Sequence, residues 1–378
     1  RASLAYLDFQ TSALPYHLST PERALILGMG GGSSILQAEY HATPSIDAVE
    51  LDPWLPQLLQ HRYAAFSGWQ WLGGRTKLHT GEARSYVAVD AMRYDLIQMS
   101  LLDAAGATSG GVYALNENYL YTVEAIRDYL EHLRPGGMLA ITRWVKLPPR
   151  DGLRLFATAI EALRESGSGN PANHLMMIRG WSTSTLVIKN GAVESSEIGA
   201  LIDFCKARAF DIVYFPGIAA DYLANFYNIL PRPYFREGTL ALLGDGASDY
   251  IERYKFDIRP VRDDRPYFFD FFKWRALPEI VSLYRRGGFS LLELGYPVLI
   301  LTLIQAIFVS LLLVLLPLRF LDSAAGGMAG VRRWRILSYF LVIGIAYLFI
   351  EMAFIQKFSL FLAHPVDRKS TRLNSSHF

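Results

Sequence analysis

The sequence has little of what several common classes of protein require. Its 378 residues include one cysteine, Cys205, so no internal disulfide and no cysteine-rich metal site can form. Charged residues make up only 19%, and no run of lysines and arginines forms the basic stripe typical of nucleic-acid-binding proteins. We therefore expect no metal and no nucleic-acid partner.

Hydrophobic residues make up 51% of the chain and are concentrated near its C-terminus. The range 294–320 holds more than the ~20 apolar residues that span a bilayer, interrupted by Gln305 and two tolerated prolines. The range 336–361 is also long enough, although it carries Glu351. The sequence predicts a transmembrane helix over each range, and therefore a multi-pass membrane protein in contact with lipid.

An α/β fold is predicted for residues 24–189, where short apolar runs alternate with longer amphipathic ones. Five expected strands and the helices between them follow the order typical of βαβ units around a parallel sheet. The strands are 24–27, 46–50, 77–80, 95–99 and 138–142, and the helices include 33–41 and 121–133. The turn Arg134-Pro135-Gly136-Gly137 should end the second helix, and the apolar runs 175–178 and 184–188 predict a closing hairpin.

The chain is expected to have five parts. These are a Rossmann-like domain over 1–190, a mixed α/β extension and membrane junction over 191–290 with an aromatic segment at 263–272, transmembrane helices over 294–320 and 336–361, and a tail over 367–378. The tail resembles a translated sequencing-library adapter and is set aside. Because the chain starts at Arg1, we expect a fragment, with further transmembrane segments of the same protein as partners.

Glycines follow the first predicted strand directly. Gly28, Gly30 and Gly32 lie between that strand and the helix expected from Ser33. Glycine allows positive φ and lets a ligand approach the backbone N–H groups at a helix N-terminus. Ser33 replaces the third glycine of the dinucleotide pattern, which favours an adenosyl amino acid over NAD.

Two acidic residues strengthen this interpretation. Glu50 ends the second strand about 20 residues downstream, where a carboxylate would meet ribose hydroxyls. Glu82 follows the third strand, where it could accept from an adenine amino group. A solvated carboxylate for Glu50 and an ordinary turn for Glu82 are the alternatives.

Ser100 and Asp103 lie at and just beyond the end of the fourth strand. Open α/β sheets place substrate in the crevice outside the carboxyl ends of their strands, so catalytic groups are expected there. Asp103 could bind a cationic substrate group or act as a base, or it could be a helix N-cap or loop residue.

Together these motifs resemble spermidine synthases and S-adenosylmethionine-dependent methyltransferases. Val49-Glu50-Leu51-Asp52 is similar to the ribose-binding stretch, Gly81-Glu82-Ala83 to the adenine-binding motif, and Tyr94-Asp95-Leu96-Ile97 to the catalytic strand. The resemblance implies a class I methyltransferase-type sheet, in which an antiparallel hairpin follows the parallel strands. It also implies S-adenosylmethionine or decarboxylated S-adenosylmethionine as a substrate, and an amine as a candidate second substrate.

Two departures from the family bear on the reaction. The family's Asp-x-x-Asp reads Ser100-Leu101-Leu102-Asp103 here, and Gly31 stands where these enzymes usually carry an aspartate. A serine hydroxyl is a poor base at neutral pH, so polyamine synthesis is in doubt. The first hypothesis is a transferase, for either a methyl or an aminopropyl group, and the second is a non-catalytic nucleotide- or polyamine-sensing module that regulates a membrane segment.

The segments Ser12-Ala13-Leu14-Pro15-Tyr16 and Asp263-Asp264-Arg265-Pro266-Tyr267-Phe268 are also similar to large bacterial membrane proteins that carry a spermidine synthase-like domain between hydrophobic regions. Arg332, Arg333 and Arg335 between the predicted spans would by the positive-inside tendency be cytoplasmic, whereas Arg285 and Arg286 flank the first span on its other side. Adenosyl nucleotides are made in the cytosol. We therefore expect a bacterial inner-membrane protein with its soluble domain in the cytosol.

Overall fold

The computed structural model describes residues 2–67, 74–102, 116–219, 222, 226–276, 295–321 and 330–361. The chain divides into two compact units, Arg1–Tyr296 and Pro297–Phe378.

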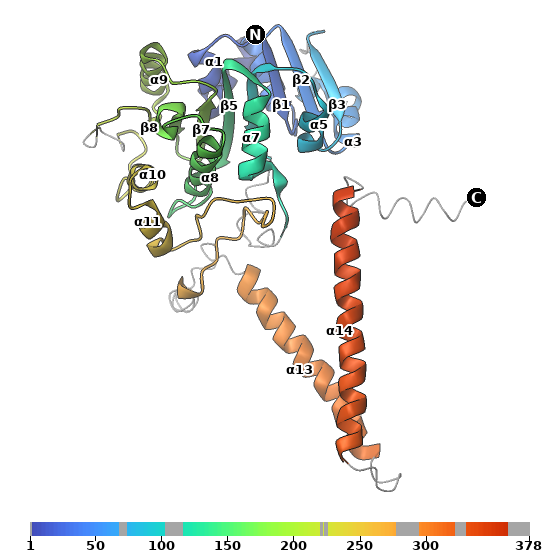
Figure 1. Cartoon of the computed structure of the whole chain (residues 1–378). Helices are drawn as coiled ribbons and strands as arrows, with labels where there is room; N and C mark the ends of the chain where they lie inside the picture. Colours follow the sequence, from blue (N-terminus) through green and yellow to red (C-terminus); the bar gives the residue numbers. More distant parts are fainter. Residues whose placement is uncertain are drawn as a thin grey trace. The chain divides into compact units, whose positions relative to one another are not determined.

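The first unit is built on an eight-stranded sheet with the order β3-β2-β1-β4-β5-β7-β6-β8 (Figure 1). The strands are β1 (Arg23–Leu27), β2 (Ser45–Glu50), β3 (Thr76–Thr80), β4 (Tyr94–Ser100), β5 (Leu133–Trp144), β6 (Leu175–Arg179), β7 (Thr183–Lys189) and β8 (Asp211–Tyr214). Strands β1 to β5 pair in parallel, whereas β7 pairs antiparallel to both β5 and β6. The predicted methyltransferase-type sheet, parallel strands followed by an antiparallel hairpin, is confirmed.

Helices cover both faces of this sheet. They are η1 (Ala2–Phe9), η2 (Thr11–Ala13), α1 (Leu14–Leu18), α2 (Ser33–Tyr40), α3 (Trp54–Gln57), η3 (Leu58–Arg62), α4 (Ala64–Ser67), α5 (Ala83–Val89), η6 (Tyr119–Tyr121), α7 (Val123–Glu131), α8 (Asp151–Glu165), η7 (Pro171–His174), α9 (Ser195–Arg208), α10 (Tyr234–Leu243), α11 (Ala247–Arg253) and η8 (Trp274–Ala276). Side chains from α1, α2 and α9 pack on one face, and those from α5, α7, α8 and α10 on the other.

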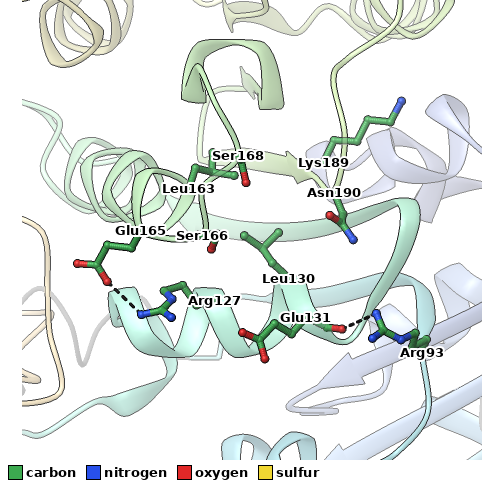
Figure 2. A pocket seen from close by; sticks show the side chains of 10 residues that line it. All are labelled: Arg93, Arg127, Leu130, Glu131, Leu163, Glu165, Ser166, Ser168, Lys189 and Asn190. Atoms are coloured by element: carbon green, nitrogen blue, oxygen red, sulfur yellow. Dashed lines mark hydrogen bonds and ion pairs between the residues drawn. The ribbon is translucent and has the colours of Figure 1, made fainter.

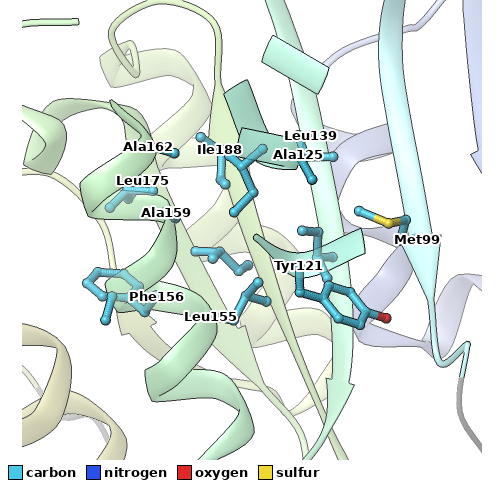
Figure 3. Close-up of a cluster of buried hydrophobic side chains, with 14 of the residues drawn as sticks. Met99, Tyr121, Ala125, Leu139, Leu155, Phe156, Ala159, Ala162, Leu175 and Ile188 are labelled. Carbon is cyan, nitrogen blue, oxygen red and sulfur yellow. The ribbon is translucent and has the colours of Figure 1, made fainter. Parts of the chain in front are cut away.

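Residues from distant parts of the sequence form the core on the second face. Figure 3 shows Met99 of β4 near Tyr121, Leu139 of β5 next to Ala125 of α7, and Phe156 on α8. Strand residues alternate between the faces, so Leu139 and Ile141 enter this core while Met138 and Ala140 enter the other. Both faces of the central strands β1 and β4 are therefore buried, whereas the edge strand β3 is partly exposed. Functional groups on the central strands are confined to the strand ends.

The turn predicted at residues 134–137 is a bulge within a strand. Helix α7 ends at Glu131, two residues earlier than expected, and β5 begins at Leu133. Leu133 pairs with Tyr94, but the next pair joins Met138 to Leu96, so residues 134–137 are accommodated against a single residue of β4. Gly136 has φ +80°, which glycine adopts without a steric penalty.

The extension after β7 contributes to the first unit's sheet and core. Strand β8 pairs with β6, and the buried side chains of Asp211 and Arg179 form an ion pair of 3.0 Å between them. In the aromatic segment 263–272, Phe268 and Phe271 are fully buried in the core of this unit. Their rings lie near guanidinium groups, which are often found over aromatic faces. The aromatic segment therefore forms part of the core of the first unit, and its role as a membrane junction stays a prediction.

The second unit contains α14 (Gly330–Phe361) and most of α13 (Gly295–Leu321), so both predicted C-terminal helices are present as helices. Among the residues that the structure describes, no helix combines the length and the apolar character needed to cross a membrane. The two transmembrane helices remain predictions.

Candidate functional site

The strand order brings the predicted site residues to one edge of the sheet. Strand β1 lies between β2 and β4. The chain runs outward from β1 to β2 and β3 and then crosses back to β4 on the other side of β1, so the strand order reverses at β1. Such a switch point opens a crevice at the carboxyl ends of the strands, which is where α/β proteins bind ligands. Gly28, Glu50 and Ser100 follow or end these three strands, and Gly81 follows β3 next to them.

The glycine loop has the backbone that its sequence predicts. Gly28, Gly30 and Gly32 have φ values of +77°, +51° and +88°, a region that residues with a Cβ rarely adopt. Gly32 is also the N-cap of α2. A Cβ built on Gly30 or Gly31 would meet no atom within 4 Å, so space lies beside this part of the loop. A ligand can therefore approach this part of the loop closely, while the N–H groups of Gly28 and Gly32 donate to the carbonyls of Val49 and Met29.

Glu50 holds the glycine loop from the end of β2. Its Oε2 accepts from the Gly30 N–H at 3.0 Å, and its Oε1 accepts from the Asp52 N–H at 3.1 Å. A carboxylate offers about four acceptor positions, so two contacts leave capacity for ribose hydroxyls. The arrangement joins the loop and the carboxylate that the sequence predicted as partners.

Glu82 is the N-cap of α5. Its two carboxylate oxygens accept from the N–H groups of Arg84 and Ser85 at 3.1 and 2.7 Å. The preceding residue, Gly81, donates its N–H to the Glu50 carbonyl at 2.9 Å, which fixes Glu82 beside the end of β2. Capping accounts for the acidic residue here, and its contact with adenine stays a prediction.

Ser100 ends β4, and its Oγ lies 3.4 Å from the amide nitrogen of Gln98. Leu101 then turns with φ +50°, and Leu102 packs against Gly28 so closely that a Cβ on Gly28 would lie 2.0 Å from Leu102 Cδ2. Leu102 therefore lies against the glycine loop. Asp103, the second predicted catalytic residue, lies outside the described residues.

A buried hydrogen-bond network beside Ser100 was not predicted. Gln98 is fully buried in β4; its Oε1 accepts from the Tyr16 hydroxyl at 2.7 Å, and its amide nitrogen donates to the Ser12 carbonyl at 3.1 Å and to Gln37 Oε1 at 3.0 Å. Burial raises the pKa of Tyr16 well above its usual value. The sequence offered one signal for this network, the glutamine within an otherwise apolar strand, because a buried side-chain amide must form hydrogen bonds with other polar groups.

No family model matches the chain. A polyamine aminopropyltransferase from Vibrio vulnificus (strain CMCP6) is 42% identical over 124 residues, which are 32% of this chain and 36% of that protein. One from Korarchaeum cryptofilum (strain OPF8) is 27% identical over 136 residues, 35% of this chain and 40% of that protein. Over these segments the chain is similar to polyamine aminopropyltransferases.

The chain spans well under half the length of the two curated relatives, both of which are named as transferases. The spermidine synthase of Thermotoga maritima is similar in structure with a TM-score of 0.38 and 14% identity, over 52% of this chain and 62% of that one. A likeness at that level carries no argument about function. The fold assignment depends on the strand order and pairing described above.

A pocket of about 550 Å³ lies away from the predicted site (Figure 2). Its lining includes residues from the ends of α7 and α8 and Lys189 and Asn190 at the end of β7, near where β5 begins. Arg127 pairs with Glu165 at 3.1 Å, and Arg93 donates to the Glu131 carbonyl at 2.8 Å. Lys189 pairs with Glu197 at 2.7 Å, so the basic side chains of the lining have partners within the protein. The pocket lies at the edge of the sheet opposite the glycine loop.

Proposed function

We propose that the chain binds S-adenosylmethionine or decarboxylated S-adenosylmethionine at the glycine loop and transfers a methyl or an aminopropyl group from it. The hydrogen bond from the Gly30 N–H to Glu50 carries the proposal, because it joins the positive-φ loop to the carboxylate expected at the ribose. The names of the curated relatives add support for a transferase.

In either transfer, a nucleophile attacks a carbon bound to the sulfonium, and the carbon–sulfur bond breaks with its electrons passing to sulfur. Methyl transfer leaves S-adenosylhomocysteine, and aminopropyl transfer leaves methylthioadenosine. An amine must lose its proton before it can attack, so aminopropyl transfer requires a base near the end of β4. Ser100 cannot supply that base unaided, and Asp103 is the other candidate in this segment.

Product analysis separates the two transfers. The full chain is incubated with each sulfonium substrate and an amine such as putrescine, and nucleoside products are measured by mass spectrometry. The serine at position 100 favours methyl transfer, whereas the relatives' names favour aminopropyl transfer, so the product decides between them. In a Ser100→Asp variant, aminopropyl transfer should rise if a missing carboxylate limits it, and a Ser100→Asn variant of nearly equal size controls for shape.

A non-catalytic sensing module is the second candidate. Ser100 and Gly31 support it, because both stand where the family places amine-handling aspartates. This module would bind the nucleotide or a polyamine and regulate a membrane segment. The sensing-module hypothesis predicts that the chain binds the nucleotide tightly but forms no transfer product, and that the Ser100→Asp variant forms none either.

Attachment to a bacterial inner membrane, with the first unit in the cytosol, is part of the proposal. The apolar composition of residues 294–320 and 336–361 supports it. Carbonate extraction of membranes from cells that express the full chain tests attachment, and protease access to the first unit from either side tests orientation. Release of the chain into the carbonate supernatant would contradict attachment.

A further inference from the structure

Three side chains that the proposed function does not use meet beside the N-terminal segment. Asp8 lies in η1, His17 in α1, and His41 directly after α2. Their candidate ligand atoms all lie within 4.8 Å of one another. All three side chains are largely shielded from solvent, with exposed fractions of 13%, 30% and 15% respectively.

The two imidazoles approach the same carboxylate oxygen. His17 Nε2 lies 2.6 Å and His41 Nε2 lies 3.1 Å from Asp8 Oδ1. The His41 nitrogen is buried but makes no hydrogen bond of acceptable geometry, although it faces an oxygen at that distance. Two ring nitrogens and one carboxylate oxygen are thus gathered around one point, and this donor set suits zinc and neighbouring transition metals.

The carboxylate is held by a fourth residue. Arg208, the last residue of α9, contacts Asp8 Oδ2 through Nη2 and donates from Nε to the Asp8 carbonyl at 2.5 Å. A partner on one carboxylate oxygen commonly orients the other toward a metal. Arg208 Nη2 also lies 3.4 Å from His17 Nε2, so a metal would have to displace that contact.

We propose that Asp8, His17 and His41 form a binding site for a divalent transition metal such as Zn²⁺, with water completing the coordination. Ligand atoms of a tetrahedral zinc site lie about 3.3 Å apart, so the distance from Asp8 to His41 needs little change and the distance from Asp8 to His17 must open by about 0.7 Å. The site would join η1, α1 and the end of α2. Through α1 it would also steady Tyr16, which bonds to Gln98 next to Ser100.

Metal content and stability of the full chain test this site. Untagged protein is stripped with a chelator, incubated with Zn²⁺, passed through a desalting column and measured by mass spectrometry of the metal. We expect one zinc per chain, and a rise in Tm of about 5 °C or more at zinc concentrations 100-fold above Kd. His17→Asn and His41→Asn should each weaken binding at least tenfold.

His79 gives a matched control, because it forms a 3.0 Å pair with Asp47 and belongs to no such three-residue group among the described residues. His79→Asn should bind zinc as the unchanged chain does. Absence of zinc from the folded chain, or equal binding by all three variants, would overturn the proposal. If the histidine variants do not fold, Co²⁺ on the unchanged chain decides: visible bands of four- or five-coordinate cobalt support the site, and their absence overturns it.

Discussion

The contact between Leu102 and Gly28 predicts that two similar substitutions in the glycine loop have different effects. Gly28→Ala and Gly30→Ala both place a Cβ on a residue with positive φ, which costs about 1 kcal/mol or somewhat more in each case. At Gly30 the added carbon meets nothing within 4 Å, so the backbone cost is the whole effect. At Gly28 the carbon would lie 2.0 Å from Leu102 Cδ2 and 3.3 Å from Cγ.

Leu102 must therefore move when Gly28 gains a side chain. Overpacking of this kind costs ~1–3 kcal/mol, and because Cδ2 is the end of a flexible side chain we expect the lower part of that range. Gly28→Ala should thus lower the free energy of unfolding by about 2–3 kcal/mol, and Gly30→Ala by only ~1 kcal/mol. Leu102→Ala removes both clashing atoms, so Gly28→Ala in that background should cost only the backbone part.

Urea unfolding of the full chain, followed by tryptophan fluorescence, measures the four proteins of this double-mutant cycle and Gly30→Ala. The coupling between Gly28→Ala and Leu102→Ala should be about 1 kcal/mol, with the double variant more stable than the sum of the singles predicts. Additivity within about 0.5 kcal/mol would refute the contact between Leu102 and the loop.

Two further predictions concern buried charges. The Asp211 carboxylate accepts from three N–H groups in residues 226–228 and pairs with buried Arg179. Asp211→Ala removes it, so the free energy of unfolding measured in urea should fall by about 3–5 kcal/mol. A loss below about 1 kcal/mol would contradict the ion pair. Burial acts to raise the pKa of Asp257, but the hydrogen bond from Arg259 and the charges of Arg154 and Arg259 outweigh it and hold that pKa below the usual 3.8. The carboxylate therefore contributes stability above about pH 4 that is lost as the pH falls through its lower folded-state pKa. Asp257→Asn should flatten the pH dependence of Tm in this acid range, and an unchanged slope would contradict the assignment.

Local patterns predicted the parallel sheet and the glycine loop well. Most strands of the parallel sheet contain a short apolar run, and Gly28, Gly30 and Gly32 directly follow one of them, so neighbouring residues carried the information. Strand β3 is more polar and was predicted from its place in the alternation of strands and helices. The parallel pairing then places Glu50 beside the loop, as the topology of βαβ units requires.

Features that depend on distant residues could not be predicted in the same way. The contact between Tyr16 and Gln98 joins residues 82 positions apart, and nothing near either residue identifies the other. Strand β8 has only four residues, and its place depends on pairing with β6. The bulge at residues 134–137 resembled a turn because proline and glycine suit both.

The burial of the aromatic segment likewise depends on tertiary contacts. Phe268 and Phe271 belong to a strongly aromatic segment, and the fold brings Arg143 near the first ring and Arg150 and Arg154 near the second. The composition of the segment alone could not identify these neighbours. The positions of the site residues depend less on such tertiary contacts. Glu82 is an exception in its role, because it caps the N-terminus of α5 and the start of that helix had not been predicted.

Nucleotide binding at the glycine loop is the central claim, and calorimetric titration of the full chain tests it most directly. The ligands are S-adenosylmethionine, decarboxylated S-adenosylmethionine and methylthioadenosine. Glu50→Ala removes the carboxylate at the loop, and Asp249→Ala, at a carboxylate that is 72% exposed, is the control. The account predicts saturable binding of at least one ligand that weakens at least tenfold in Glu50→Ala and is unchanged in Asp249→Ala; a folded chain that binds none of them, or binds equally well without Glu50, would contradict it.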